Sequence, residues 1–170
     1  SLLDAPGFNS SDFKSLSTII YGASPMPMGT LDKAGELLPH VNLEQGYGMT
    51  ECGVVTMSSP DFHSLEARQS GRIRSAGVAG ALQEIRVFND QGNELPVGEV
   101  GEVVVRGTNV MLGYWGKPEL TKDVIVDGWL HTGDGGYIDD QGRLYIVDRV
   151  KDMVISGGEN VYSSEVETIV

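Results

Sequence analysis

Residues 17–48 read STIIYGASPMPMGTLDKAGELLPHVNLEQGYG, and this stretch indicates an α/β fold. Residues 17–21 form a short β-branched run that ends at a glycine, which is typical of a buried strand. Residues 41–45 have the pattern of a second strand, which Gly46 and Gly48 are expected to break. A strand, a helical pattern and a second strand in this order predict an α/β unit.

The helix expected between these strands has recognisable ends. Thr30 is placed to cap it, and Pro39 is placed to end it. Its apolar face would carry Leu31, Ala34 and Leu38.

The following segment, residues 61–82, carries turn signals and the basic residues Arg68, Arg72 and Arg74. We interpret these arginines as a solvated loop and assign them no functional role.

Residues 83–149 are predicted to be all-β. Apolar and charged residues alternate over 84–87, residues 89–93 form a turn, and three valines at 103–105 form a buried strand. Residues 137–147 have the pattern of a hairpin. Strands this short, with turns this close, favour a small barrel or a strongly bent sheet.

The pattern changes again over residues 150–170. An apolar run at 153–156 is followed by a sharp turn at Gly157 and Gly158, and Ser164 and Glu167 have the spacing of a capping box. A helix is therefore expected to begin where the sequence stops. Together with the absence of an initiator Met, this predicts that the chain is a piece of a longer protein.

The composition argues against two classes of protein, nucleic-acid-binding proteins and membrane-spanning proteins. The chain has 170 residues, 40% of them hydrophobic, and a formal net charge of −12, so it can form one domain, or a domain and part of another. The acidic balance argues against nucleic-acid binding, and no apolar run approaches the ~20 residues of a membrane span. The start of the chain lacks a signal-peptide pattern, and the single Cys52 favours a reducing compartment, so we expect a cytoplasmic location.

The stretch 45–51, QGYGMTE, combines groups suited to a nucleotide. Gly46 and Gly48 would let the backbone approach a ligand, and Tyr47 offers an aromatic face to a base. Thr50 can donate to a phosphate oxygen, and Glu51 can bind a hard cation such as Mg²⁺. The alternative is a tight turn with a packed tyrosine.

Three other stretches are candidates. In GWLHTGDGGY (128–137), Asp134 can accept hydrogen bonds from a ribose diol, although it could instead cap a turn. Arg149, in DRVKD (148–152), could reach a ribose or phosphate, or could lie on a solvated interdomain strand. His131 is better explained as a packed loop residue than as a catalyst. The small residues that follow the first strand, where a planar ring could lie on the backbone, are Gly22, Ala23 and Ser24.

Other chemistries find no support in the sequence. Three His and one Cys are scattered, so a zinc site is not expected. The sequence lacks a Gly-x-Ser-x-Gly nucleophile motif and a Walker-type phosphate loop.

In their order and spacing these motifs resemble the adenylate-forming superfamily, which comprises acyl-coenzyme A synthetases, carrier-protein adenylation domains and luciferases. The resemblance covers essentially the whole chain, and the strings that carry it are YGA at 21–23, GYGMTE at 46–51, GEVVVRG at 101–107, GYW at 113–115, WLHTGD at 129–134, DRVKD at 148–152 and GGENVY at 157–162. The stretch ISGGENVY (155–162) is most similar to fatty-acyl and aryl-acyl coenzyme A ligases.

The resemblance implies two half-reactions. A carboxylate attacks the α-phosphate of ATP–Mg²⁺ to give an acyl-adenylate, and the thiol of coenzyme A then displaces AMP. Tyr47 would stack on adenine, Thr50 would touch the α-phosphate, and Glu51 would bind Mg²⁺. Asp134 and Arg149 would contact the ribose.

The remaining implied roles concern the pocket and the domain junction. Gly22, Ala23 and Ser24 would line the base and acyl pocket. Lys151 would be the hinge between a large and a small domain, and Gly157 and Gly158 would line the pantetheine tunnel.

This sequence also differs from the family pattern, both in two missing elements and at single positions. The family's phosphate loop would lie upstream of Ser1 and its catalytic lysine downstream of Val170, so we expect the chain alone to be inactive. Ser24, Gly135 and Ser163 depart from the residues common at these positions; only the first is expected to alter the pocket.

The resulting expectation is a fragment with α/β and β parts. Residues 1–149 would be the C-terminal part of the large AMP-binding domain, with 83–149 as a β-rich, barrel-like subdomain, and 150–170 would be the hinge and the start of a small α+β domain. Its substrates would be ATP, coenzyme A and a carboxylic acid, with fatty acids favoured. The sequence leaves the acid and the oligomeric state open.

Three alternatives stay open. These are an adenylation domain that loads a carrier protein, a non-catalytic nucleotide-binding scaffold, and a β-rich interaction module.

Overall fold

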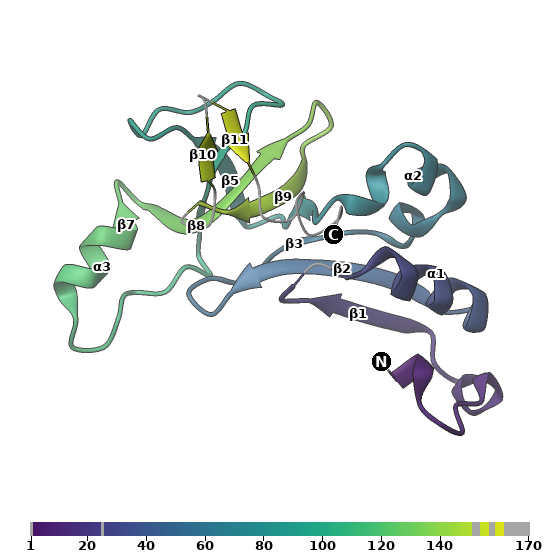
Figure 1. Ribbon diagram of the computed structural model, residues 1–170. Helices are drawn as coiled ribbons and strands as arrows, with labels where there is room; N and C mark the ends of the chain where they lie inside the picture. The colour runs from purple at the N-terminus through teal and green to yellow at the C-terminus, as the bar shows by residue number, and fades with distance from the viewer. Residues whose placement is uncertain (1, 25, 151–153, 157–158, 162–170) are drawn as a thin grey trace.

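The α/β unit expected from the opening stretch is present. Strands β1 (Thr18–Gly22) and β2 (Asn42–Met49) are parallel neighbours, and helix α1 (Met28–Leu37) connects them. The computed structural model describes residues 2–24, 26–150, 154–156 and 159–161, and Figure 1 shows how its elements are arranged. The helix packs on the two strands through a core of buried side chains: Tyr21, Leu31, Ala34, Leu43 and Ile73.

Two local predictions in this unit are wrong. Thr30 does not cap α1, because the helix begins at Met28 and the carbonyl of Pro27 accepts the amides of Thr30 and Leu31. Strand β2 is not broken by its glycines, because Gly46 has a backbone partner on each side, Gly22 in β1 and Met57 in β3 (Gly53–Met57).

One sheet continues from this unit through the β-rich half. Its order is β1-β2-β3-β4-β9-β8-β6-β5, with β7 paired to the side of β8, and only β1 and β2 are parallel. The further strands are β4 (Gly77–Ala79), β5 (Gln83–Phe88), β6 (Gly101–Gly107), β7 (Ile125–Val126), β8 (Trp129–Ile138) and β9 (Arg143–Arg149). The α/β and β-rich parts therefore share one sheet.

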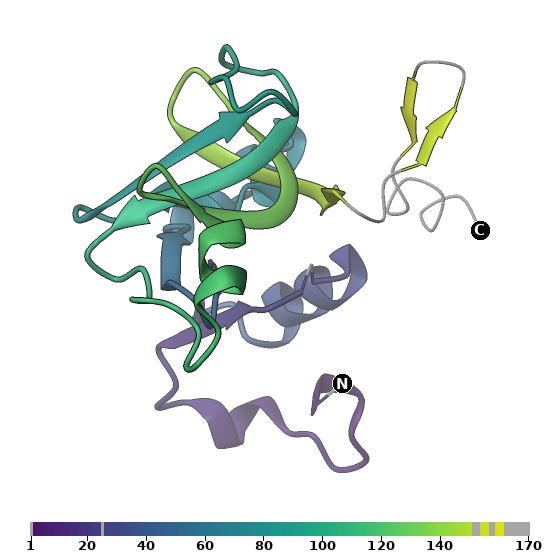
Figure 2. The ribbon, with the colours of Figure 1, turned by 90° about the vertical axis from the view of Figure 1, so that its left-hand side faces the viewer.

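The sheet bends strongly. A strongly bent sheet was one of the two shapes expected from the sequence, the other being a small barrel. Figure 2 shows the bend along β8, where the register shifts against both β6 and β9. Among the described strands, β1 and β5 are the two edges of the sheet and are not paired with each other. The pairing therefore leaves the sheet open and does not close it into a barrel. The buried strand and the hairpin are confirmed: Val103, Val104 and Val105 are fully buried, and β8 and β9 join through a turn at residues 139–142.

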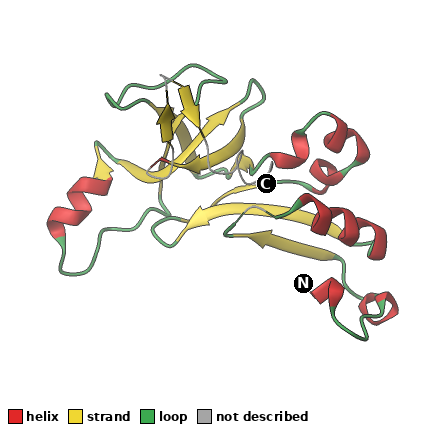
Figure 3. Cartoon of the chain, viewed as in Figure 1, coloured by secondary structure: helices red, strands yellow, loops and turns green. Residues whose placement is uncertain are grey.

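Besides α1, helical segments lie between β3 and β4 and between β6 and β7 (Figure 3). Helix α3 (Pro118–Val124) lies between β6 and β7, in a region predicted to be all-β. The segment expected to be turns contains α2 (Leu65–Gln69), which Ser64 caps. The remaining short elements are the 3₁₀ turns η1 (Leu2–Asp4), η2 (Ser10–Phe13), η3 (Pro60–His63) and η4 (Arg72–Arg74).

Two of the three arginines of this segment have partners, whereas Arg74 is exposed. Arg68 forms an ion pair with Asp32 of α1, and Arg72 lies 3.7 Å from Asp61 and over the ring of Phe62. The Arg68 pair attaches the segment to α1, whereas the contacts of Arg72 lie within the segment.

At the end of the chain, β10 (Val154–Ser156) and β11 (Glu159–Val161) pair as a separate antiparallel sheet. The predicted turn at 157–158 and the predicted helix after Ser164 lie outside the described residues. None of the helices in the described part of the chain has the length and apolar character of a membrane span.

Candidate nucleotide site

Three of the proposed site residues lie on three different strands and meet at Asp134. The hydroxyl of Tyr47, on β2, donates to Asp134 Oδ2 on β8 over 2.8 Å. Arg149, at the end of β9, lies with Nε 3.4 Å from Asp134 Oδ1 and is paired with Asp134 across the β8–β9 ladder. Asp134 therefore accepts contacts from two other strands and does not merely cap a turn.

Asp134 retains capacity for a ligand. A carboxylate offers about four lone-pair positions, and the two protein contacts use one on each oxygen. Burial raises the pKa of Tyr47, and the nearby Asp134 carboxylate raises it further. Tyr47 consequently stays a neutral donor at physiological pH.

Three small residues end and follow β1, next to β2. Gly22 is paired with Gly46, and a Cβ at Gly22 would lie 2.3 Å from the Gly46 carbonyl oxygen. Ala23 has a φ of 68°, which non-glycine residues adopt rarely. Ser24 follows it and is exposed. Gly22 and Ala23 thus bring no bulky side chain to this end of the strand.

Thr50 and Glu51 occupy the turn between β2 and β3. Thr50 is exposed, and Glu51 is partly exposed. A loop from the distant residues 108–114 contacts this turn: Tyr114 donates its hydroxyl to Glu51 Oε1 over 2.8 Å, and the amide of Met111 donates to the Glu51 carbonyl over 2.7 Å. The donated hydrogen bond raises the pKa of Tyr114.

Sequence reasoning assigned no role to Tyr114 or to Asn109, whose side chain donates to the Cys52 carbonyl. The available signal was the GYW string at 113–115, which was used only for the resemblance. His131 is also placed differently from the prediction, because it lies within β8 and is paired with Glu102 instead of packing in a loop.

The donor set fits a magnesium ion that is shared with phosphate. No group of three metal-binding side chains occurs in the described residues, and Glu51 is the acidic group in the turn. Mg²⁺ is usually held by one or two carboxylates together with substrate phosphates and waters, so a single free carboxylate oxygen suffices. Lys151, Gly157 and Gly158 lie outside the described residues, so the structure does not place them.

A cleft of about 730 Å³ adjoins the site on another side. Its walls include Phe88, Glu102, Trp129 and His131, and of the proposed nucleotide residues Arg149 alone lines it. The cleft is therefore a neighbour of the Tyr47–Asp134 group and does not contain it.

The comparisons with known proteins agree with this geometry. Residues 1–115 match the family of AMP-binding enzymes. The chain belongs to the AMP-binding enzyme family. Its resemblance to adenylate-forming enzymes is thereby confirmed.

Curated members of this family resemble nearly the whole chain. A feruloyl-CoA synthase from Amycolatopsis is 44% identical over 95% of the chain. A long-chain-fatty-acid–CoA ligase from Salmonella typhimurium is 40% identical over 99%, and the fatty acid–[acyl-carrier-protein] ligase ScoC from Streptomyces coeruleorubidus is 36% identical over 99%. The chain covers 32%, 29% and 32% of these relatives, so it spans about a third of their length.

Solved structures of AMP-binding enzymes share the fold. The amide bond synthetase McbA from Marinactinospora thermotolerans is 37% identical, with a TM-score of 0.85 over 96% of this chain and 33% of its own. The O-succinylbenzoate coenzyme A synthetase MenE from Bacillus subtilis, solved with ATP and a magnesium ion, is 37% identical, with a TM-score of 0.79 over 92% of this chain and 31% of its own.

Proposed function

We propose that the chain is part of an ATP-dependent ligase that activates a carboxylic acid as its adenylate and transfers the acyl group to coenzyme A. The convergence of Tyr47, Asp134 and Arg149 beside the carboxyl ends of two parallel strands carries this proposal. Open sheets commonly bind ligands at such strand ends. Family membership supports the same chemistry.

The proposed roles follow from the positions of the side chains. Tyr47 stacks on adenine, beside the bare backbone of Gly22, Ala23, Ser24, Gly46 and Gly48. Asp134 accepts hydrogen bonds from the ribose hydroxyls, and the half-exposed guanidinium of Arg149 donates to the ribose.

Thr50 and Glu51 serve the phosphates. The exposed Thr50 donates to the α-phosphate as the acid's carboxylate attacks the phosphorus, which forms the acyl–AMP anhydride and releases pyrophosphate. Glu51 holds Mg²⁺, which neutralises phosphate charge when bound. In the second half-reaction the thiol of coenzyme A attacks the acyl carbon, and AMP leaves.

The names of the relatives define the candidate acids and acceptors. One acts as a feruloyl-CoA synthase and others as ligases of long-chain fatty acids. ScoC is named for a carrier protein as acceptor and McbA for amide bond synthesis, so transfer to a carrier protein is the second candidate. We favour coenzyme A because two of the three relatives reported above are coenzyme A ligases.

We also propose the domain boundaries expected from the sequence. Residues 1–149 belong to the large AMP-binding domain, 83–149 being its β-rich part, and residues 150–170 contain the hinge at Lys151 and begin the small domain. Gly157 and Gly158 line the pantetheine tunnel. A cytoplasmic location is supported by the single cysteine, Cys52, which is buried and free.

The test is ATP–pyrophosphate exchange by the longer parent protein with a panel of acids that includes ferulate and C12–C18 fatty acids. Exchange with at least one acid, followed by thioester formation on added coenzyme A, is the expected result. The absence of exchange with every acid, despite ATP binding, would favour a non-catalytic scaffold. Acyl transfer only to a carrier protein would favour the second candidate.

A further inference from the structure

The backbone that carries Asp134 leaves the regular ladder between β6 and β8. Val104 faces His131 and Glu102 faces Gly135, so β6 advances by two residues where β8 advances by four. Gly133, inside this bulge, has a φ of 73°. Amides in such a bulge lose their ladder partners and need other acceptors.

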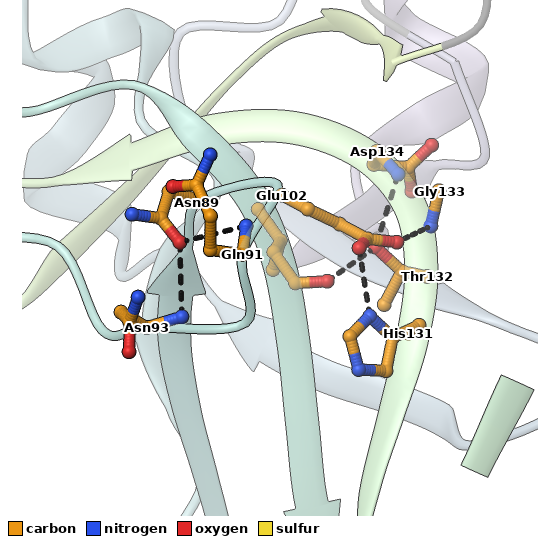
Figure 4. A network of polar contacts seen from close by, with 9 residues as sticks. Asn89, Gln91, Asn93, Glu102, His131, Thr132, Gly133 and Asp134 are labelled. Atoms are coloured by element: carbon orange, nitrogen blue, oxygen red, sulfur yellow. Dashed lines mark hydrogen bonds and ion pairs between the residues drawn. The ribbon is translucent and has the colours of Figure 1, made fainter. Parts of the chain in front are cut away.

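Two side chains supply these acceptors (Figure 4). The amide of Gly133 donates to Glu102 Oε1 over 3.0 Å, and the amide of Asp134 donates to Thr132 Oγ1 over 3.1 Å. The buried Thr132 hydroxyl in turn donates to the Val103 carbonyl over 2.7 Å. The bulge is thus attached to β6 at two points.

His131 contacts the second carboxylate oxygen of Glu102. Its Nδ1 lies 2.7 Å from Glu102 Oε2, and its ring meets Phe88 edge-on. Both side chains of this pair are 25% exposed, whereas those of the surface pair Arg86–Glu94 nearby are 45% and 53% exposed. Exposed ion pairs contribute little to stability and are not fixed in one geometry. The less exposed His131–Glu102 pair is therefore better suited than Arg86–Glu94 to hold a backbone segment in place.

We propose that Glu102 is a positioning residue for nucleotide binding. Through the Gly133 amide it holds the bulge in the shape that presents Asp134 to Tyr47, Arg149 and the ribose, and His131 holds Glu102 in place. This inference rests on the proposed function for the ligand of Asp134. Glu102 itself does not touch the nucleotide in this scheme.

The test compares KM values in the parent enzyme. Glu102→Ala is expected to raise the KM for ATP roughly tenfold, the loss of about one hydrogen bond to a charged acceptor, with less than a twofold change in the KM for the acid. Glu102→Gln is expected to restore most of the ATP affinity, because its amide oxygen can still accept from Gly133. Glu94→Ala, which removes an exposed carboxylate on the same hairpin, is expected to leave both KM values unchanged.

If Glu102 only stabilised the fold, its variants would change stability and not the KM for ATP. If Glu102→Ala lowers the melting temperature but leaves the KM for ATP unchanged, or if Glu102→Gln is as impaired as Glu102→Ala, the positioning role is wrong. Should Glu102→Ala fail to fold, Glu102→Asp keeps the charge and withdraws the acceptor from Gly133, and the same selective rise in the KM for ATP is required of it.

Asp134→Ala separates this inference from the proposed function. If Asp134→Ala leaves the KM for ATP unchanged, the proposed nucleotide site is wrong, and the inference fails with it. If Asp134→Ala raises that KM and Glu102→Ala does not, only the positioning role of Glu102 is overturned.

Discussion

At the scale of single residues, side-chain hydroxyls connect the motifs to one another. Tyr47 joins the GYGMTE and WLHTGD strings through Asp134, and Tyr114 joins GYGMTE to the GYW string through Glu51. Both tyrosines have raised pKa values, so each remains a donor throughout the physiological range. The separate motifs therefore act as one polar unit.

The Tyr114 contact gives a first prediction. Tyr114→Phe keeps the ring and removes the donor to Glu51 Oε1, so the carboxylate loses a fixed orientation. We expect the Mg²⁺ concentration for half-maximal pyrophosphate exchange in the parent to rise about threefold, since a hydrogen bond to a partly exposed charged group contributes modestly. Glu51→Gln, which removes the charge, should suppress exchange. An unchanged Mg²⁺ dependence in Tyr114→Phe would count against the role of Glu51.

The candidate residues were named from their motifs, but residue types alone left each motif with an alternative, and the roles came from the resemblance that the order of the motifs carries. Tyr47, Asp134 and Arg149 could be named from their motifs, and the structure brings them together. Tyr114 could not be found in this way. Its contact with Glu51 crosses 63 residues and depends on how a loop folds back on a turn, which periodicity does not encode.

At the scale of elements, tertiary pairing overrode local propensity. Gly46 and Gly48 have poor strand propensity and were expected to end the strand, yet β2 runs through both because it is paired with β1 and β3. The same pairing explains why glycine is needed. A Cβ at Gly48 would lie 1.9 Å from the Gly53 carbonyl oxygen, so the two strands could not approach so closely.

Replacement of Gly48 by Ala tests this requirement. Because the obstructing atoms belong to the backbone of Gly53 and Val54, the turn with Thr50 and Glu51 must shift. We expect a loss of about 1–3 kcal/mol in the free energy of unfolding and a clear loss of exchange activity in the parent. Gly29→Ala is the matched control: it has open space in α1 and should increase stability by about 0.5–1 kcal/mol. Equal effects of the two substitutions on urea unfolding would refute the argument.

The segment η3 is predicted to make the fold sensitive to acid. His63 Nε2 lies 2.8 Å from the Tyr21 hydroxyl, and burial lowers the pKa of His63 below its ordinary 6.5. Below about pH 6.5 the unfolded chain binds this proton more readily than the folded chain, so the free energy of unfolding should fall as the pH drops from 6.5 toward the lower folded pKa. Above 6.5 this contribution is fully present.

Urea unfolding between pH 7.5 and pH 5 measures this effect. The free energy of unfolding of the His63→Gln variant should fall less steeply with decreasing pH than that of the native protein. Tyr21→Phe should keep the native slope, because burial, and not the tyrosine hydroxyl, is the main cause of the lowered pKa of His63. A native slope in His63→Gln would show that other groups cause the acid sensitivity.

At the scale of the whole molecule, the chain would supply one side of the proposed nucleotide site. It spans about a third of the length of the relatives it matches, and its sequence lacks a Walker-type loop that could hold the β- and γ-phosphates. We therefore expect the 170-residue chain alone to show no pyrophosphate exchange under conditions in which the parent is active. Exchange by the isolated chain would mean that it holds the phosphates by itself.

The proposed hinge predicts that the two half-reactions can be separated. Proline fixes φ near −65°, so Lys151→Pro in the parent would prevent the backbone rotation that a change of domain arrangement requires. Adenylation needs only one arrangement, so pyrophosphate exchange should stay within about twofold of the native rate, while thioester formation should fall by at least about tenfold. Lys151→Ala, which leaves φ free, should retain both activities. If Lys151→Pro slowed both half-reactions equally, residue 151 would be part of the adenylation site and not a hinge.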